Sequence, residues 1–246
     1  MKSSTPVDRV RALPPAREAD RPLLVTTAAL ALAFLGWESA DGDLLLAYWA
    51  GGGGGFSLRD HWLLTSVMHS GARWLAWALA LGLCLAVWWP IGALQRLPQS
   101  RRLQLAGGVL LSVLTVSLLK SFNPAACPWD LTRFGGVAQP VSHWLWWAAP
   151  AGGSGRCFPA GHASAGFAFV GGYFVFRQQA PEIARRWLLA AVAAGLVLGL
   201  AQQWRGAHFM SHTLWSGWLC WCLAWGLDAA HGRLAPATQP ADGGVA

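Results

Sequence analysis

The feature that most constrains this chain is the recurrence of long apolar segments along its length. Six of them contain about 15 residues each and few charges: Leu23–Trp37, Leu75–Trp89, Leu105–Leu119, Gly161–Phe176, Trp187–Gln202 and Thr213–Leu227. A helix needs about 20 mainly apolar residues to cross a bilayer, and flanking Trp, Ala and Gly residues extend most of the segments toward that length. The pattern predicts an all-α membrane protein with about six transmembrane helices.

The composition favours a membrane protein over a nucleic-acid-binding one. Hydrophobic residues make up 54% of the chain and charged residues 12%, whereas soluble domains usually carry about 25% charge. The chain has 17 tryptophans, a residue that favours the membrane interface. The net charge of +7 is spread over short loops and forms no basic patch. We therefore expect membrane lipids around the protein and no nucleic-acid partner.

The basic residues also predict the orientation of the chain. With the N-terminus in the cytoplasm, twelve of the 18 Lys and Arg residues fall on the cytoplasmic side and six on the other. The positive-inside rule then puts both termini in the cytoplasm of a bacterial-type inner membrane. Three segments, 38–74, 120–160 and 203–212, are expected to face the periplasm.

The domain organisation is expected to be simple, with a cytoplasmic tail (1–21), one membrane domain (22–230) and a second cytoplasmic tail (231–246). A basic flank before the first apolar segment is also typical of a signal peptide, but no small-residue cleavage site follows, which favours a retained span. Gly51–Gly55 cannot sustain a helix cheaply. Its apolar neighbours Leu44–Trp49 and His61–Val67 are expected either to lie along the membrane surface or to belong to a plain linker.

Three periplasmic pieces are unusually rich in polar groups: residues 120–133 (KSFNPAACPWDLTR), 156–164 (RCFPAGHAS) and 205–212 (RGAHFMSH). In the second piece, Gly161 and His162 follow a proline at the start of a predicted helix, a position that suits an anion. In the third piece, His208 and His212 are four residues apart and share one helix face with Arg205. Charged side chains at membrane depth are costly unless they face a polar cavity, so these pieces predict a cationic pocket.

The order of a lysine, then PxGH, then a histidine pair, on successive outer loops of a six-span protein, resembles the type 2 phosphatidic acid phosphatase family. That family shares its catalytic core with vanadium haloperoxidases, and its motifs are KxxxxxxRP, PSGH and SRxxxxxHxxxD. The match covers about residues 105–230. The resemblance implies that Lys120 binds phosphate, that His208 is a nucleophile that forms a phosphohistidine, and that His162 is the general acid. It implies no metal and no cofactor.

Several positions depart from these motifs. Cys127 and Gln202 stand where the family has arginine, Ala160 replaces a serine, and His212 replaces the aspartate that orients the nucleophile. The weaker partner at His212 predicts slower turnover. Loss of the serine at Ala160 removes one phosphate hydrogen bond, worth roughly 1.5–3 kcal/mol.

Neighbouring residues are candidates to replace the lost contacts. Arg205 lies nearly one helical turn after the missing arginine of the third motif. Arg133 and Arg156 lie in the same outer segment as the missing arginine of the first motif, and we expect them to bind substrate as well. A neutral His212 can accept the Nδ1–H of His208 and leave Nε2 as the nucleophile.

Two cysteines are candidates for a disulfide. Cys127 and Cys157 both lie in the predicted periplasmic segment, and the periplasm is oxidising. A bridge between them would close a loop of about 30 residues, worth roughly 3–4 kcal/mol. Two free thiols are the alternative. The three remaining cysteines lie in apolar runs and are expected to be unpaired.

Other readings stay open. His208, His212 and His162 also have the spacing of metal ligands, although nearby Lys120 and Arg205 would repel a cation. The remaining histidines lie outside the motifs and are expected to be ordinary surface or interface residues: His61, His69, His143 and His231.

We expect an enzyme that hydrolyses a phosphomonoester or pyrophosphate of a lipid. Phosphotransfer to a lipid acceptor, or lipid-phosphate binding without catalysis, would use the same pocket. The sequence specifies neither the lipid nor the oligomeric state.

Overall fold

The computed structural model describes residues 20–145, 147–149, 152–153 and 155–234. Within this part of the chain the structure is helical apart from loops and two isolated β-bridges, which confirms the all-α prediction. Most of the predicted tails, 1–21 and 231–246, lies outside the described residues.

Every predicted apolar segment is largely helical. The fourth segment is divided between two short α-helices joined by one 3-10 turn, η5 (Ala168–Val170). The α-helices that correspond to the six segments are α2 (Arg21–Ser39), α4 (Ala72–Leu85), α5 (Gln99–Phe122), α6 (Gly161–Phe167) with α7 (Gly171–Phe176), α8 (Pro181–Trp204) and α9 (Met210–Leu234).

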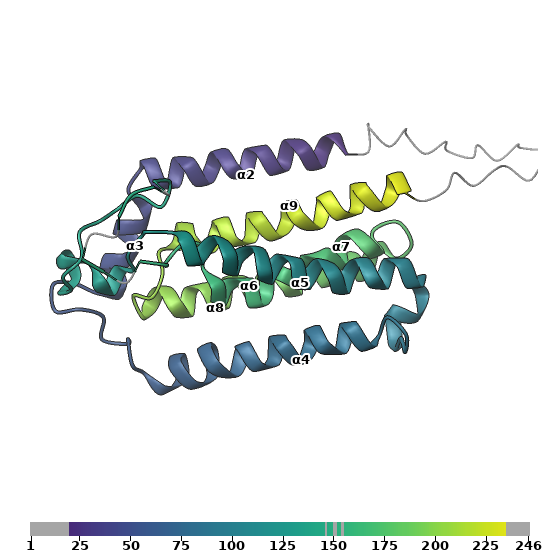
Figure 1. Cartoon of the computed structure of the whole chain (residues 1–246), viewed down its shortest axis with the longest axis horizontal. Helices are drawn as coiled ribbons and strands as arrows, with labels where there is room; N and C mark the ends of the chain where they lie inside the picture. Colours follow the sequence, from purple (N-terminus) through teal and green to yellow (C-terminus); the bar gives the residue numbers. More distant parts are fainter. Residues whose placement is uncertain (1–19, 146, 150–151, 154, 235–246) are drawn as a thin grey trace, which may run out of the picture.

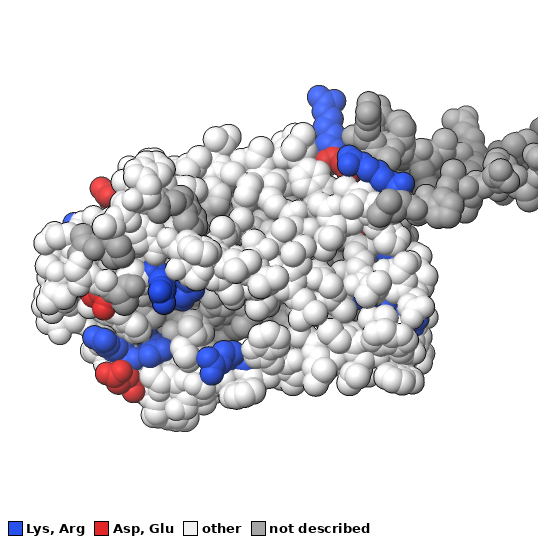
Figure 2. Space-filling model, in the orientation of Figure 1, with Lys and Arg blue, Asp and Glu red and all other residues white. Residues whose placement is uncertain are grey.

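Three of these helices, α2, α5 and α8, are long and apolar enough to cross a membrane. At 1.5 Å per residue, the 24 residues of α5 or α8 extend about 36 Å, more than the roughly 30 Å of a bilayer core. Leu24, Leu118 and Leu189 on these helices are more than half exposed, as lipid-facing side chains would be. Figure 2 shows that most of one face is uncharged, with charged side chains gathered in its left half and at its upper right. Membrane crossing by α4, by α6 with α7, and by α9 stays a prediction.

The helices run side by side as one bundle (Figure 1). The start of α2 and the end of α9 lie at the same end of the bundle, as expected for an even number of spans. At the opposite end lie α3 (Gly42–Ala50) and the long connection between α5 and α6. We call this opposite end the loop end.

Glycines let α6 approach α8 closely in the middle of the bundle. A Cβ atom added at Gly166 would lie 2.3 Å from the backbone nitrogen of Gly195, and one added at Gly195 would lie 2.5 Å from the ring of Phe167. Because no side chain fits at such distances, the two backbones pack directly against each other. This packing fixes α6 in the core, with its first residues pointing to the loop end.

The segment before α4 contains a turn and then a helix. The Gly51–Gly55 run forms a turn, in which Gly52 and Gly55 exchange backbone hydrogen bonds of 3.0 and 2.8 Å. The residues Leu63–Gly71 then form a π-helix, η1, that leads directly into α4. The predicted surface segment His61–Val67 is therefore mainly the beginning of a longer helix that carries the second apolar segment toward the loop end.

Candidate active site

The three histidines of the predicted motifs meet at the loop end. His162 is the second residue of α6, His208 lies in the turn between α8 and α9, and His212 is in the first turn of α9. The ring centroids of His162 and His208 are 6.1 Å apart, and those of His208 and His212 are 5.9 Å apart. His208 and His212 are each 2% exposed. Three short segments distant in sequence thus form one row of imidazoles.

The orientation of His208 is fixed by the backbone of Cys157. The Nδ1 atom of His208 lies 2.7 Å from the carbonyl oxygen of Cys157. A carbonyl only accepts hydrogen bonds, so Nδ1 carries the proton and donates it, and Nε2 keeps a free lone pair. The expected acceptor was the side chain of His212. That expectation was wrong, and the Nδ1 atom of His212 is buried with no hydrogen-bond partner among the described residues.

Burial keeps His208 neutral. Its pKa is lowered well below the ordinary value of 6.5, chiefly by desolvation and further by the nearby charges of Lys120, His212 and His162. The hydrogen bond to the carbonyl of Cys157 opposes this shift and is the smaller effect. A neutral imidazole with its Nε2 lone pair free is the form that can attack an electrophile.

The predicted disulfide is present and lies next to this histidine. Cys127 and Cys157 are bonded, with their Cα atoms 5.1 Å apart. The bridge joins the connection after α5 to the residues that lead into α6, and the N–H of Cys157 donates to the carbonyl of Ala125 at 3.0 Å. The carbonyl that holds His208 therefore belongs to a cross-linked segment. Three cysteines are free: Cys84, Cys220 and Cys222.

Lys120 reaches the start of α6 from the last turn of α5. A Cβ atom added at Gly161 would lie 3.9 Å from Nζ of Lys120 and 3.8 Å from its Cδ. The ammonium group thus borders the open space above Gly161, next to His162. Its charge also acts on His208.

Arg205, just after α8, is fixed by contacts with three residues. Its Nε donates to the carbonyl of Arg59 at 2.8 Å, and its Nη1 donates to Oε1 of Gln202 at 3.0 Å. The guanidinium also lies over the ring of Trp129, 5.7 Å from its centroid, and the residue is 9% exposed. Its charge acts on His162. Arg205 is therefore bonded to the side chain that stands at the arginine position of the third motif, and its binding of substrate stays a prediction.

Arg133 and Arg156 lie elsewhere. Arg133 lines a separate cavity of about 260 Å³, together with Glu38, His143 and His212. Arg156 is exposed, and its backbone N–H donates to the carbonyl of Asn123 at 2.7 Å. Their binding of substrate stays a prediction.

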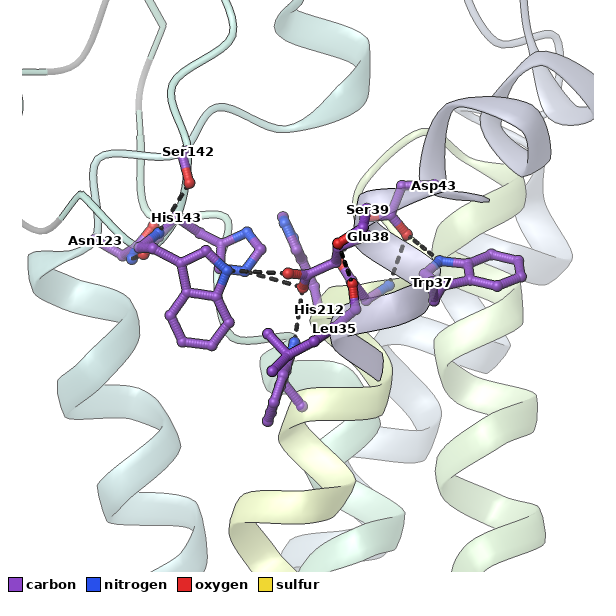
Figure 3. Close-up of polar contacts among 12 residues, drawn as sticks. Leu35, Trp37, Glu38, Ser39, Asp43, Asn123, Ser142, His143 and His212 are labelled. Atoms are coloured by element: carbon purple, nitrogen blue, oxygen red, sulfur yellow. Dashed lines mark hydrogen bonds and ion pairs between the residues drawn. The ribbon is translucent and has the colours of Figure 1, made fainter. Parts of the chain in front are cut away.

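A second polar layer, which the motifs do not include, supports His212 (Figure 3). The carboxylate of Glu38 accepts hydrogen bonds from the indole N–H groups of Trp215 at 2.7 Å and Trp144 at 2.9 Å, and it pairs with His143 at 3.2 Å. The ring of His143 lies 5.4 Å from that of His212, centroid to centroid. His143 is therefore not the ordinary surface or interface residue that its sequence context predicts.

The sequence also missed His69 and Arg73. The ring of His69, in η1, lies 3.9 Å from the ring of His162, centroid to centroid, so His69 is not an ordinary surface residue. Both residues line a cavity of about 240 Å³ with Gly161 and His162. No local motif marks them, since they precede His162 by about 90 residues and meet it only when α4 packs against α6 and η1 against α8.

The cavity beside His162 is lined by polar side chains at one end and mainly by apolar side chains elsewhere. At one end are the cationic and imidazole groups, and the remaining walls come largely from apolar side chains of α4, α5, α8 and the α6–α7 region. The apolar lining includes Trp77, Ala80, Val109, Val113, Phe169 and Leu198. A polar end and an apolar body suit an amphiphile.

A metal ion fits the histidines poorly. Ligand atoms of Cys157, His208 and His212 lie within 4.8 Å of one another. The sulfur of Cys157 is in a disulfide and offers no thiolate, and Nδ1 of His208 is taken by a carbonyl. The charge of Lys120 would also oppose a bound cation.

Comparison with known proteins identifies the family. A family model described as the PAP2 superfamily matches residues 101–234, more than half of the chain. The match runs from the first turn of α5 to the end of α9 and contains all the motif residues, whereas His69 and Arg73 precede it. Neither the curated proteins nor the solved structures contain a match.

Proposed function

Since the chain belongs to the PAP2 superfamily, whose members are usually phosphatases, we propose that it removes phosphate from a phosphorylated lipid through a phosphohistidine intermediate. The observation that carries this proposal is the 2.7 Å hydrogen bond from Nδ1 of His208 to the carbonyl of Cys157. It leaves Nε2 unprotonated, within a row that includes His162 and faces Lys120. The proposed site faces the periplasm, on a protein with six spans and both termini in the cytoplasm.

In the first step, Nε2 of His208 attacks phosphorus. A P–N bond forms, the P–O bond to the lipid breaks, and His162 gives its proton to the departing oxygen. The phosphate brings the negative charge that lets His162 hold a proton.

In the second step, water attacks the phosphohistidine. His162 takes a proton from the water, the P–N bond breaks, and inorganic phosphate leaves with His208 restored. The equatorial phosphate oxygens carry most of the charge in both steps, and Lys120 and Arg205 stabilise them. A lipid alcohol in place of water would make the product a phosphorylated lipid.

The lipid part of the proposal rests on the cavity beside His162. Its apolar walls lie between helices whose outer surfaces are themselves apolar, so a hydrocarbon chain can lie there while its phosphate reaches His162. Burial of each CH₂ group contributes about 0.8 kcal/mol, which favours an amphiphile over a soluble phosphate ester.

The test is phosphate release by the full-length chain in detergent with EDTA present. Substrates would be phosphatidic acid, phosphatidylglycerol phosphate and an isoprenyl pyrophosphate, each with and without vanadate. His208→Ala is the informative variant, and His61→Ala, an exposed histidine in the segment before η1, is its matched control. Release that requires His208, tolerates EDTA and is blocked by vanadate is the expected result. Loss of release in EDTA would point to a metal site, and no release by a folded protein that binds the lipid would point to a non-catalytic binder.

A further inference from the structure

His69 and Arg73 line one side of the cavity at the proposed phosphate site. His69 lies near the end of η1, and Arg73 follows it by four residues at the start of α4. The helix continues from one to the other, so the two side chains are about one turn apart. Both line the cavity that Gly161 and His162 also line.

The contact between His69 and His162 is close. The two rings are 3.9 Å apart between centroids and tilted by 36°, and His69 is half-buried. The Nδ1 atom of His162 is buried with no hydrogen-bond partner among the described residues. The orientation of His162 therefore depends on ring packing, and His69 is the ring packed most closely against it.

Arg73 has more donor groups free to bind an anion than Arg205 has. Arg205 already donates two N–H groups to protein acceptors. Arg73 is exposed at the cavity and makes no hydrogen bond or ion pair within the part of the chain that the structure describes. Its positive charge nevertheless acts on His69 and His162, together with those of Lys120 from α5 and Arg205 from the end of α8.

Building on the proposed function, we infer that Arg73 binds a phosphate oxygen of the substrate beside His162 and that His69 is a positioning residue for His162. Arg73 supplies a guanidinium to a site in which Cys127 stands at the arginine position of the first motif. His69 holds the ring of His162 toward the leaving oxygen. Both residues come from η1 and α4, outside the matched family region.

Orthovanadate binding tests this inference without requiring turnover, because five-coordinate vanadate mimics the phosphoryl group in flight. Its affinity for the full-length chain in detergent would be measured by calorimetry for wild type, Arg73→Gln, Arg73→Lys and the control Arg185→Gln. Arg185 is exposed on α8. We expect Arg73→Gln to weaken binding by roughly ten- to a hundredfold, the loss of one charged hydrogen bond, and Arg73→Lys to lose less.

The role of His69 needs a conservative pair of variants. His69→Ala removes the ring and is expected to weaken vanadate binding by about tenfold, whereas His69→Phe keeps a ring against His162 and is expected to restore most of the affinity. Unfolding midpoints close to wild type would establish that the variants are folded.

The possible outcomes test the role of Arg73, the role of His69 and the proposed catalytic function separately. Vanadate affinity of Arg73→Gln equal to that of Arg185→Gln would overturn the assignment of Arg73. Equal loss in His69→Ala and His69→Phe, or no loss in either, would overturn the positioning role. Failure of the wild type to bind vanadate would overturn both assignments. Vanadate binding that depends on Arg73 in a protein that releases no phosphate would retain the anion site and reject only the catalytic function.

Discussion

The Nδ1 atom of His208 donates a hydrogen bond to the carbonyl oxygen of Cys157, 2.7 Å away, and Cys157 is itself bonded to Cys127. A backbone carbonyl thus holds the imidazole of His208 in the tautomer that is protonated at Nδ1. In the third motif of the family, an aspartate carboxylate orients the nucleophilic histidine instead. The carbonyl adds no negative charge, so it orients His208 but stabilises a positively charged intermediate less than a carboxylate would. The disulfide is the covalent restraint on this carbonyl.

Loss of the disulfide is expected to lower activity as well as stability. Cys127→Ser with Cys157→Ser keeps the carbonyl but releases the segment that carries it. Misplacement of a reacting group by about 1 Å can cost about a hundredfold in rate, so we expect kcat to fall by tenfold or more. The unfolding free energy should fall by roughly 3–4 kcal/mol.

Phosphate release and thermal unfolding in dithiothreitol, compared with the double variant, would measure both effects. Dithiothreitol should slow the wild type and leave the double variant unchanged. Unchanged kcat in a double variant of lower stability would mean that the carbonyl is positioned without the disulfide.

His212 is expected to matter less than His208. Its ring lies 5.9 Å from that of His208, and the hydrogen bond that orients the nucleophile goes to Cys157. We expect His212→Ala to lower kcat by about tenfold, through looser packing around His208, and His208→Ala to lower it by a thousandfold or more. Single-turnover phosphate release from both variants would compare them. A loss in His212→Ala as large as that in His208→Ala would give His212 a direct part in the chemistry.

Acid is expected to destabilise the protein through His208. Burial lowers the pKa of His208 in the folded chain below 6.5, while in the unfolded chain the side chain titrates near 6.5. Below about pH 6.5 the unfolded state therefore binds more protons than the folded state, so stability falls as pH falls toward the lower pKa of the folded state. Unfolding midpoints between pH 5 and pH 8 would show this slope, and His208→Asn should reduce it. An equal slope in His208→Asn would assign the acid sensitivity to other groups.

Glu38 is expected to hold the loop end together. Its carboxylate accepts hydrogen bonds from Trp144 in the connection and Trp215 in α9. Glu38→Ala leaves both indole N–H groups without that acceptor and should cost about 2 kcal/mol or more of unfolding free energy. Glu38→Gln keeps one acceptor oxygen and should cost less. Thermal unfolding of the two variants, with Glu182→Gln at an exposed position on α8 as control, would measure this.

The sequence predicted the parts of this structure that depend on local pattern. Apolar runs predicted the helices, and motif order predicted that His162 would meet His208. The oxidising compartment predicted the bond between Cys127 and Cys157. The carbonyl that orients His208 could not be predicted, because every residue has a carbonyl and only folding selects one. The contact of His69 with His162 has no local signal either, since it depends on how η1 and α4 pack against the core.

Substitutions at three glycines can distinguish an effect on substrate binding from an effect on folding. An added Cβ at Gly161 would make only ordinary contacts, the nearest 3.8 Å away on Lys120, so Gly161→Ala should fold normally. The new methyl group would, however, occupy space beside Nζ of Lys120 that we assign to the phosphate. We therefore expect kcat/KM to fall by about tenfold or more with the unfolding midpoint unchanged.

Two other glycine variants serve as controls, one expected to disrupt folding and one expected to have no effect. Gly166→Ala should unfold or fail to express, because its Cβ would lie 2.3 Å from the backbone of Gly195. Gly107→Ala on α5 meets no atom within 4 Å and should behave as wild type in both measurements. Gly161→Ala with wild-type kcat/KM would mean that the phosphate does not approach the start of α6, and the site would then have to lie farther from Lys120.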